Sequence, residues 1–348
     1  MLNSYEPTFI YLQEEDAIKA GATDMKMTLA AVEKVHKLMA EGQIYNPPKS
    51  HLGLPLGSTK QTWQSFFNSM PCFIGGDVNV GGMKWAAEAK ENAKVPGIPY
   101  GIDITILSDP KTVLPFCVLN GTLITAMRTG ATAGLFAKYT APTGTDTVTS
   151  IGCGVVGRCT VMAIAEAMPE VKKVYIADLD MSKAQDIINE YQPKYPWLEL
   201  IPTTDTKAAA EKSQVIITQT TSTKEFIDES WVVPGKSLVA VGAIEVKPEV
   251  VLKSDIVVVD EWNQMITNES RPVAVLHREG KIEKEQTVDL TDLILDPKKG
   301  RQNDGQFVYS SALGLGALDI MISYEMYLKA KAEGIGTVLK MYDKPLWE

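Results

Sequence analysis

A glycine-rich turn between two apolar runs constrains the fold of this chain more than any other stretch. In order, the chain has a β-prone run at 148–151, the glycines Gly152, Gly154 and Gly157, a helical run at 160–168, and an apolar run at 174–177 that ends on Asp178. Strand, glycine turn, helix, strand and acid are the parts of the dinucleotide-binding fingerprint, in their usual order. The pattern predicts a Rossmann-type α/β domain; the alternative is a glycine turn in a sheet that binds no nucleotide.

Each glycine of the turn has its own task in that fingerprint. Gly152 permits the tight turn, Gly154 lets a pyrophosphate approach the backbone, and Gly157 lets the helix pack close to the strand. The backbone N–H groups at the start of the helix, at Val155 and Val156, would face the phosphates, and the helix dipole adds partial positive charge there.

The acid at the end of the second strand predicts which nicotinamide cofactor binds. Asp178 lies about twenty residues past Gly157, where the fingerprint places the acid that binds the adenosine ribose. Leu179 and Asp180 follow, and the next cation is Lys183. A 2′-phosphate would meet negative charge and find no cation, so the cofactor is expected to be NAD rather than NADP.

Composition narrows the class of protein. A length of 348 residues suggests two domains, and a net charge of −9 argues against nucleic acid or an anionic membrane as partner. We find no signal peptide at the N-terminus, and no apolar run reaches the roughly 18 residues of a membrane span. Four cysteines without a CxxC pair and only three histidines make a metal site unexpected and predict a cytoplasmic protein.

The rest of the chain divides into two patterns. Residues 1–127 are expected to form an α+β module with a mostly antiparallel sheet; its predicted elements are a helix at 23–41 and strands at 66–74, 82–87, 102–107 and 114–119. His36 on that helix is expected to be solvated. A helix at 122–139 precedes the nucleotide domain, in which strands and helices alternate as in a parallel sheet. A last helix at 317–332 is expected to pack on the first domain.

Two basic residues stand in apolar surroundings. Lys84 lies in an apolar strand; if buried, it loses solvation and can exchange protons near neutral pH, whereas at a strand edge its ammonium would simply reach water. Arg128 lies among small residues on a helix that looks buried, where it needs an acidic partner. A substrate carboxylate would match its planar fork, and an internal ion pair with Asp or Glu would serve equally well.

Several stretches, in order along nearly the whole chain, resemble motifs of one protein family. They are Gly-Met-Lys-Trp at 82–85 (like "KxVN"), Met-Arg-Thr-Gly-Ala-Thr at 127–132 (like "LRTAAT"), Thr-Gln-Thr-Thr-Ser at 218–222 ("TxTxS"), Ala-Val-Gly-Ala at 240–243 ("AVGA"), Gly-Arg-Gln-Asn-Asp at 300–304 ("GRxSD"), and Gly314 with Asp319 ("GxxxxD"). The chain is similar to the ornithine cyclodeaminase/mu-crystallin family.

That resemblance implies a domain organisation and a site. A substrate-binding and dimerisation domain would comprise residues 1–127 with 317–348, and an NAD-binding Rossmann domain residues 128–316; the protein would be a homodimer. Lys84 and Arg128 would meet the substrate at the nicotinamide, and Lys49 would replace an arginine that binds the substrate carboxylate. The motifs add seven residues to the cofactor contacts of the glycine turn: Thr129, Thr218, Thr220, Ser222, Val241, Gly242 and Gly314.

Two departures from the family pattern bear on the reaction. Cyclodeaminases carry an acid where this chain has Asn68, and a catalytic aspartate where it has Ile244, with Glu245 next. Glu245 could substitute if its loop rotates, although neighbouring side chains on an extended backbone point apart. The substrate pocket is expected to draw on Trp85, Tyr100, His51 and Met70.

The resemblance therefore favours one of three functions. The family's common step is hydride transfer at a carbon that bears an amino group, and a cyclising enzyme also needs a carboxylate to take a proton from the distal ammonium. The absence of two candidate acids favours an NAD-dependent amino-acid dehydrogenase or imine reductase, acting on a small amino or imino acid. The alternatives are ornithine cyclodeaminase itself, which converts ornithine to proline and ammonia, and a mu-crystallin-like binding protein.

Overall fold

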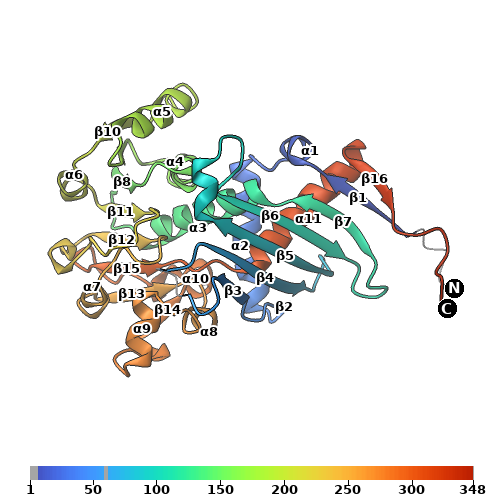
Figure 1. The fold of residues 1–348 in the computed structure, drawn as a ribbon. Helices are drawn as coiled ribbons and strands as arrows, with labels where there is room; N and C mark the ends of the chain where they lie inside the picture. Colours follow the sequence, from blue (N-terminus) through green and yellow to red (C-terminus); the bar gives the residue numbers. More distant parts are fainter. Residues whose placement is uncertain (1–6, 59–61, 348) are drawn as a thin grey trace. The chain divides into compact units, whose positions relative to one another are not determined.

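The computed structural model describes residues 7–58 and 62–347 and contains two compact units (Figure 1). Unit 1 comprises residues 1–125 with 315–348, and unit 2 comprises residues 126–314. Helix α3 (Thr122–Thr140) begins in unit 1 and continues into unit 2.

Unit 1 is an α+β unit built on a mixed sheet. Its elements are β1 (Thr8–Leu12), α1 (Glu14–Lys19), α2 (Met25–Ala40), β2 (Ile44–Tyr45), β3 (Ser50–Leu54), β4 (Ser65–Ile74), β5 (Val80–Ala89), the 3₁₀ helix η1 (Lys90–Lys94), β6 (Gly101–Ser108), β7 (Pro115–Asn120), α11 (Gly316–Glu333) and β16 (Thr337–Lys340). The strand order is β16-β1-β7-β6-β5-β4-β2, with β3 also paired to β4. Only the β1–β7 pairing is parallel among the described residues, so the expected antiparallel character is confirmed.

Helix α2 buries more of its circumference than its sequence predicts. Asp24 caps it by accepting a hydrogen bond from the Met27 N–H at 3.0 Å. The prediction of a solvated His36 is wrong: the imidazole is fully buried, because α11 packs along this helix and extends the covered face to include it. Burial lowers the pKa of His36 to about 4, so the ring is neutral at physiological pH.

The two faces of the unit 1 sheet differ sharply. On one face of β6 the residues are buried and include polar as well as apolar side chains. On the opposite face, Ile102 and Ile104 are 44% and 45% exposed. Trp85 of β5 pairs with Ile104, is 41% exposed, and stacks on the Phe67 ring at 5.6 Å. The outer face is therefore an apolar surface, while α11 covers the inner face along β4, β5 and β6.

Unit 2 has the Rossmann architecture that the glycine turn predicts. Its elements are β8 (Thr147–Ile151), α4 (Val155–Ala167), β9 (Lys173–Ala177), α5 (Met181–Tyr191), β10 (Glu199–Thr203), α6 (Thr206–Lys212), β11 (Val215–Thr218), η2 (Glu229–Trp231), β12 (Ser237–Ala240), α7 (Pro248–Leu252), β13 (Ile256–Val259), α8 (Trp262–Met265), α9 (Pro272–Arg278), η3 (Lys284–Gln286), β14 (Thr287–Asp289), α10 (Leu290–Leu295), η4 (Pro297–Lys299) and β15 (Val308–Ser311). The pairings are parallel, in the order β10-β9-β8-β11-β12-β15-β13-β14. The chain order reverses between β8 and β11, the switch point where such sheets bind ligands at the strands' carboxyl ends.

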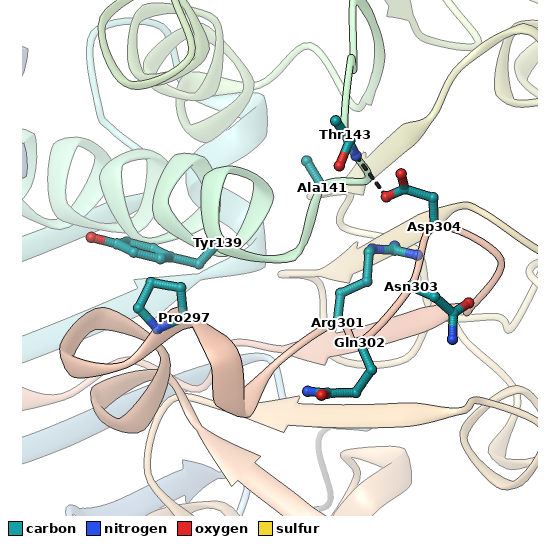
Figure 2. A pocket seen from close by; sticks show the side chains of 8 residues that line it. All are labelled: Tyr139, Ala141, Thr143, Pro297, Arg301, Gln302, Asn303 and Asp304. Atoms are coloured by element: carbon teal, nitrogen blue, oxygen red, sulfur yellow. Dashed lines mark hydrogen bonds between the residues drawn. The ribbon is translucent and has the colours of Figure 1, made fainter.

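A pocket of about 370 Å³ lies at the other end of this sheet, near the amino ends of β12 and β15 (Figure 2). Tyr139 and Pro297 lie on one side of it and Arg301 on another. The Arg301 guanidinium donates to the carbonyl oxygens of Thr140, Lys236 and Gln306 and to the Ser237 hydroxyl, so it ties the turn at 301–306 to the sheet. In the described part of the chain, no helix is both long and apolar enough to cross a membrane.

Candidate functional site

The glycine turn of unit 2 has the geometry of a phosphate-binding loop. Gly152 has a φ of +105°, which disfavours any residue with a Cβ, and a Cβ on Gly157 would lie 2.0 Å from the Gly152 carbonyl oxygen. No atom lies within 4 Å of where a Cβ of Gly154 would be, so the backbone there is open to a ligand. These three observations match the three tasks expected of the glycines.

The start of helix α4 offers backbone donors without a competing acid. Gly154 is the N-cap and has no side chain to cap the helix, and the first turn, which contains Val155 and Val156, has no acidic residue. Burial, assisted by the nearby Asp178 carboxylate, raises the pKa of the Cys153 thiol to about 12, so it adds no negative charge beside the loop. Such a helix start fits a pyrophosphate.

Asp178 is held against the glycine turn. Its Oδ2 accepts a hydrogen bond from the Cys153 N–H at 2.8 Å, and its Oδ1 accepts from the Asp180 N–H at 3.0 Å. The nearby cation Arg158 forms an ion pair with Glu190 of α5. The turn, the helix start and the acid thus fit the pyrophosphate and ribose of a bound NAD, which would supply the hydride acceptor.

The strand ends beside the switch point are tied to one another by Glu245. The Val241 and Gly242 N–H groups donate to the Thr218 carbonyl oxygen, and the Thr220 N–H donates to Glu245 Oε1 at 2.5 Å. A Cβ on Gly242 would lie 2.0 Å from Glu245 Oε2, so this carboxylate rests directly on the Gly242 backbone. Ser222 continues the loop after Thr220, where its N–H donates to the Thr220 hydroxyl at 3.1 Å.

Glu245 is deeply buried, with 1% of the residue exposed. Burial raises the pKa of its carboxyl, against hydrogen bonds from Thr220 and Thr218 and the charge of Arg271, which lower it. The Arg271 guanidinium itself donates to the carbonyl oxygens of Ala240, Val241 and Gly242. This placement makes the Glu245 carboxylate part of the support of the two loops.

Arg128 and Gly314 are neighbours in unit 2. A Cβ on Gly314, whose φ is +86°, would lie 2.4 Å from Arg128 Nη1, so the glycine leaves room for the guanidinium. The Gly314 and Leu313 N–H groups donate to Asp260 Oδ2 at 2.6 and 2.7 Å, which fixes this backbone. Thr129 follows Arg128 on α3 and is half-buried.

Lys84 lies in a buried ionic cluster in unit 1. Its ammonium donates to Thr125 Oγ1 at 2.6 Å and to Asp319 Oδ1 at 2.9 Å, and it lies 3.3 Å from Asp103 Oδ2. Only 1% of its side chain is exposed. The strand-edge alternative, in which the ammonium reaches water, is therefore wrong for Lys84.

The other residues expected on the substrate side are spread through unit 1. Lys49 is half-buried in the loop between β2 and β3. Asn68 Oδ1 lies 2.7 Å from His51 Nδ1, so the position where cyclodeaminases carry an acid here pairs with a histidine. Met70 pairs with Lys84 across β4 and β5 and shares its face, but Trp85 points to the outer face. Trp85 does not share the face of Lys84, because neighbouring residues of a strand face opposite ways, and its part in a substrate pocket stays a prediction.

Sequence reasoning missed four residues that organise these sites. Asp103 had a signal, since it interrupts the run Ile102-Asp-Ile-Thr-Ile106 on what proves to be the buried face. Thr125 gave no such signal, because a threonine within a helix is common and does not by itself indicate a function. Arg271 and Asp260 act on backbone atoms of distant loops, which no local pattern announces.

Comparison with known proteins identifies the relatives of this chain. The sequence profile of the ornithine cyclodeaminase/mu-crystallin family matches residues 14–334. The chain is 28% identical to the N-((2S)-2-amino-2-carboxyethyl)-L-glutamate dehydrogenase of Staphylococcus aureus, over 96% of this chain and 98% of the relative. It is 26% identical to the alanine dehydrogenase of Archaeoglobus fulgidus, over 96% and 99%.

A solved structure shares the whole fold. The Delta(1)-pyrroline-2-carboxylate reductase of Thermococcus litoralis, in complex with NADH and L-proline, has a TM-score of 0.84 and 27% identity, and the match covers 94% of this chain and 99% of that one. The resemblance found in the sequence motifs is confirmed. The chain belongs to the ornithine cyclodeaminase/mu-crystallin family.

Proposed function

We propose that this protein is an amino-acid dehydrogenase or imine reductase that interconverts a small amino acid and its imine. It is an NAD-dependent oxidoreductase, and bound NAD would supply the acceptor for the hydride on the substrate Cα. The named relatives act on alanine, on an N-substituted glutamate and on a pyrroline carboxylate, all of which carry nitrogen on the carbon next to a carboxylate. That shared group, and not a particular side chain, defines the substrate class.

The observation that carries this proposal is the buried Lys84 ammonium with its carboxylate partners. A buried lysine held by acids is suited to exchange a proton with a nitrogen that changes charge. Arg128 and Lys49 bind the substrate carboxylate, Arg128 through its planar fork and Lys49 as a point charge. Lys84 meets the substrate nitrogen.

Ornithine cyclisation is less well supported. It requires a carboxylate that deprotonates the distal ammonium of ornithine, and the two positions expected to supply one hold Asn68 and Ile244. Glu245 as a replacement remains a prediction. Its carboxylate already accepts from the Thr220 N–H and rests on Gly242, so we assign it to loop support.

One substrate panel tests the proposal. Small L-amino acids are mixed with enzyme and NAD⁺, and α-keto acids or cyclic imines with ammonia or methylamine and NADH, and absorbance at 340 nm is followed. We expect turnover of at least one amino acid or imine that bears an α-carboxylate. Conversion of ornithine to proline without net change in NADH would show the cyclodeaminase instead. Tight NADH binding without any turnover would show the mu-crystallin-like binding protein.

The apolar outer face of unit 1 supports a proposal about how copies of this chain assemble. Trp85, Ile102 and Ile104 lie side by side across paired strands on this face, and each is more than 40% exposed. Exposed apolar surface of this kind is covered in stable proteins, and a second copy of the chain offers the same face. We propose a homodimer through it. The four cysteines are free thiols and buried, which fits a reducing compartment, so we place the enzyme in the cytoplasm.

A further inference from the structure

We propose that Thr125 and Asp103 form a proton relay with Lys84, so that the proton released by the substrate nitrogen passes through Lys84 to the Asp103 carboxylate. The relay rests on the proposed role of Lys84 and supplies the proton acceptor that this role lacks. An amino acid enters as an ammonium and must lose a proton before hydride can leave its Cα. A lysine that is already an ammonium has no lone pair to take that proton.

The carboxyl groups around the Lys84 ammonium can bind one more proton. One ammonium faces two carboxyl groups, Asp103 and Asp319, and none of the three side chains is more than 6% exposed. Cys72 lies near this cluster. Burial, together with the Asp319 carboxylate, raises the pKa of the Cys72 thiol to about 12, so the thiol remains neutral. These three side chains, when ionised, bring two negative charges and one positive charge into a site that water barely reaches, where an excess of one sign is unfavourable. Taking up one proton removes that excess.

The hydrogen bonds define the path. Lys84 Nζ donates to Thr125 Oγ1 at 2.6 Å, and Thr125 Oγ1 donates to Asp103 Oδ2. As the substrate ammonium gives a proton to Nζ, the N–H bond toward Thr125 breaks and a new O–H bond forms on Oγ1. The original hydroxyl proton of Thr125 then bonds to Asp103 Oδ2. One proton enters, Asp103 becomes a carboxylic acid, and Lys84 and Thr125 are unchanged.

Asp103 suits the accepting role better than Asp319 does. Asp319 lies in the first turn of α11, where the partial positive charge of the helix N-terminus favours its ionised form. We therefore assign it to holding the ammonium. Asp103 lies on a strand, accepts one hydrogen bond from the Ala87 N–H at 3.2 Å, and is 5% exposed where Asp319 is 0% exposed. It is the member of the pair that can return the proton to water.

The decisive variant is Thr125→Val, which keeps the shape of the side chain and removes the hydroxyl. We expect kcat for the amino acid that the wild type oxidises to fall by about 10²-fold with KM within about threefold, the lower end of the range of a lost proton-transfer group. Thr125→Ser should restore kcat to within about threefold. A curved proton inventory in H₂O/D₂O mixtures should become linear in Thr125→Val, because fewer protons move together. A purely structural role of the Thr125 hydroxyl would leave the shape of the proton inventory unchanged in Thr125→Val.

Thr105→Val is the matched control. Thr105 pairs with Lys84 across β5 and β6 and is fully buried, and its hydroxyl has no hydrogen-bond partner among the described residues. Its loss should leave kcat within about threefold of the wild type. Asp103→Asn should resemble Thr125→Val, and the double variant should be no slower than either single one, since both interrupt one path. An unaffected Thr125→Val, or an equally slow Thr105→Val, would overturn the relay.

A second measurement needs no turnover. Lys84→Met removes the ammonium that both carboxyl groups contact, so one of these two buried carboxyl groups should hold a proton in the folded variant. The protonated carboxyl group stabilises the folded variant at low pH, and this stabilisation is lost as the pH rises. The melting temperature of Lys84→Met relative to wild type should fall from pH 5 to pH 8, and Asp103→Asn added to it should reduce that slope. A flat profile for Lys84→Met counts against the spare proton site, whatever the substrate panel shows. A wild type that turns over nothing, with the slope present, rejects the proposed function but not the proton site.

Discussion

Lys84 and Asp319 are joined by a hydrogen bond of 2.9 Å although 235 positions separate them in the chain. The contact depends on how closely α11 approaches β5. A Cβ on Gly82, two residues before Lys84 on the same face, would lie 2.6 Å from Ile320 Cδ1 and 2.9 Å from the Ile106 carbonyl oxygen. The absent side chain at Gly82 thus lets the helix come near enough to pair its first-turn acid with the lysine.

This packing predicts the cost of a single methyl group. Gly82→Ala should lower the free energy of unfolding by about 1–3 kcal/mol, the usual cost of overpacking, and should reduce activity by moving Asp319 away from Lys84. Gly81→Ala is the matched control, because its Cβ would meet only the Ser108 carbonyl oxygen at 3.8 Å. Urea unfolding of both variants measures the difference. Equal stability of the two variants would mean that α11 can shift without loss.

How far the sequence predicts this fold depends on how local each signal is. The parallel strands of unit 2 are short apolar runs, and the glycine turn with Asp178 fixes the identity of the first two. The runs expected at 148–151 and 174–177 form β8 and β9, which each begin one residue earlier. Strands β1 and β16 were missed, because strands of five and four residues give little pattern. The Lys84 cluster could be predicted only in part, since Lys84 and Asp319 stood out as motifs but their partners Asp103 and Thr125 are defined by folding alone.

The burial of His36 predicts an acid-sensitive stability. Its pKa is lowered to about 4 in the folded state from about 6.5 in the unfolded chain. Above pH 6.5 the ring is neutral in both states and its contribution is fully present; as pH falls toward 4 the unfolded state binds the proton first, so stability is lost. The unfolding free energy should drop by roughly 3 kcal/mol across that window through this residue. His36→Met, followed by urea unfolding at pH 7, 5.5 and 4.5, should show a shallower fall, and an unchanged slope would contradict this origin.

Selectivity for NAD should be reversible at two positions. Asp178 would repel a 2′-phosphate, and Leu179, which is 95% exposed, can be replaced without loss of packing. Asp178→Ser with Leu179→Arg should raise the ratio of kcat/KM for NADP⁺ over NAD⁺ about 10- to 100-fold, the contribution of one charge-assisted contact. Leu179→Gln with Asp178 retained is the control and should keep the NAD preference. A wild type that uses NADP⁺ as well as NAD⁺ would show that Asp178 does not select.

The apolar outer face predicts a dimer that one charge can disrupt. Ile104→Glu places a carboxylate in the middle of this face, and burying it unpaired against a second copy is unfavourable. Sedimentation velocity at micromolar concentration should show a dimer for the wild type and a monomer for Ile104→Glu. Leu252→Glu, at a residue that is 50% exposed on unit 2, is the control and should remain dimeric. A monomeric wild type would reject the assembly.

The last prediction separates substrate binding by Arg128 from proton transfer by Lys84. The substrate carboxylate keeps its charge throughout the reaction, so Arg128 in its proposed role should bind it equally in ground and transition states. Arg128→Lys loses one of two parallel hydrogen bonds and should mainly raise KM, by roughly tenfold per 1.4 kcal/mol. Lys84→Met should instead lower kcat and kcat/KM together, by about 10²- to 10⁴-fold, because the proton moves in the transition state.

Gly314→Ala tests the same division without touching either residue. Its Cβ would lie 2.4 Å from Arg128 Nη1 and should displace the guanidinium, so KM for the amino acid should rise as in Arg128→Lys. Gly144→Ala is the control for backbone strain, because Gly144 has a φ of +73° and no atom within 4 Å of a new Cβ. Steady-state kinetics with the amino acid and with the matching amine that lacks the carboxylate distinguish the causes. If Gly314→Ala weakens both substrates equally, Gly314 acts on the cofactor side, as its sequence motif predicts, and not through Arg128.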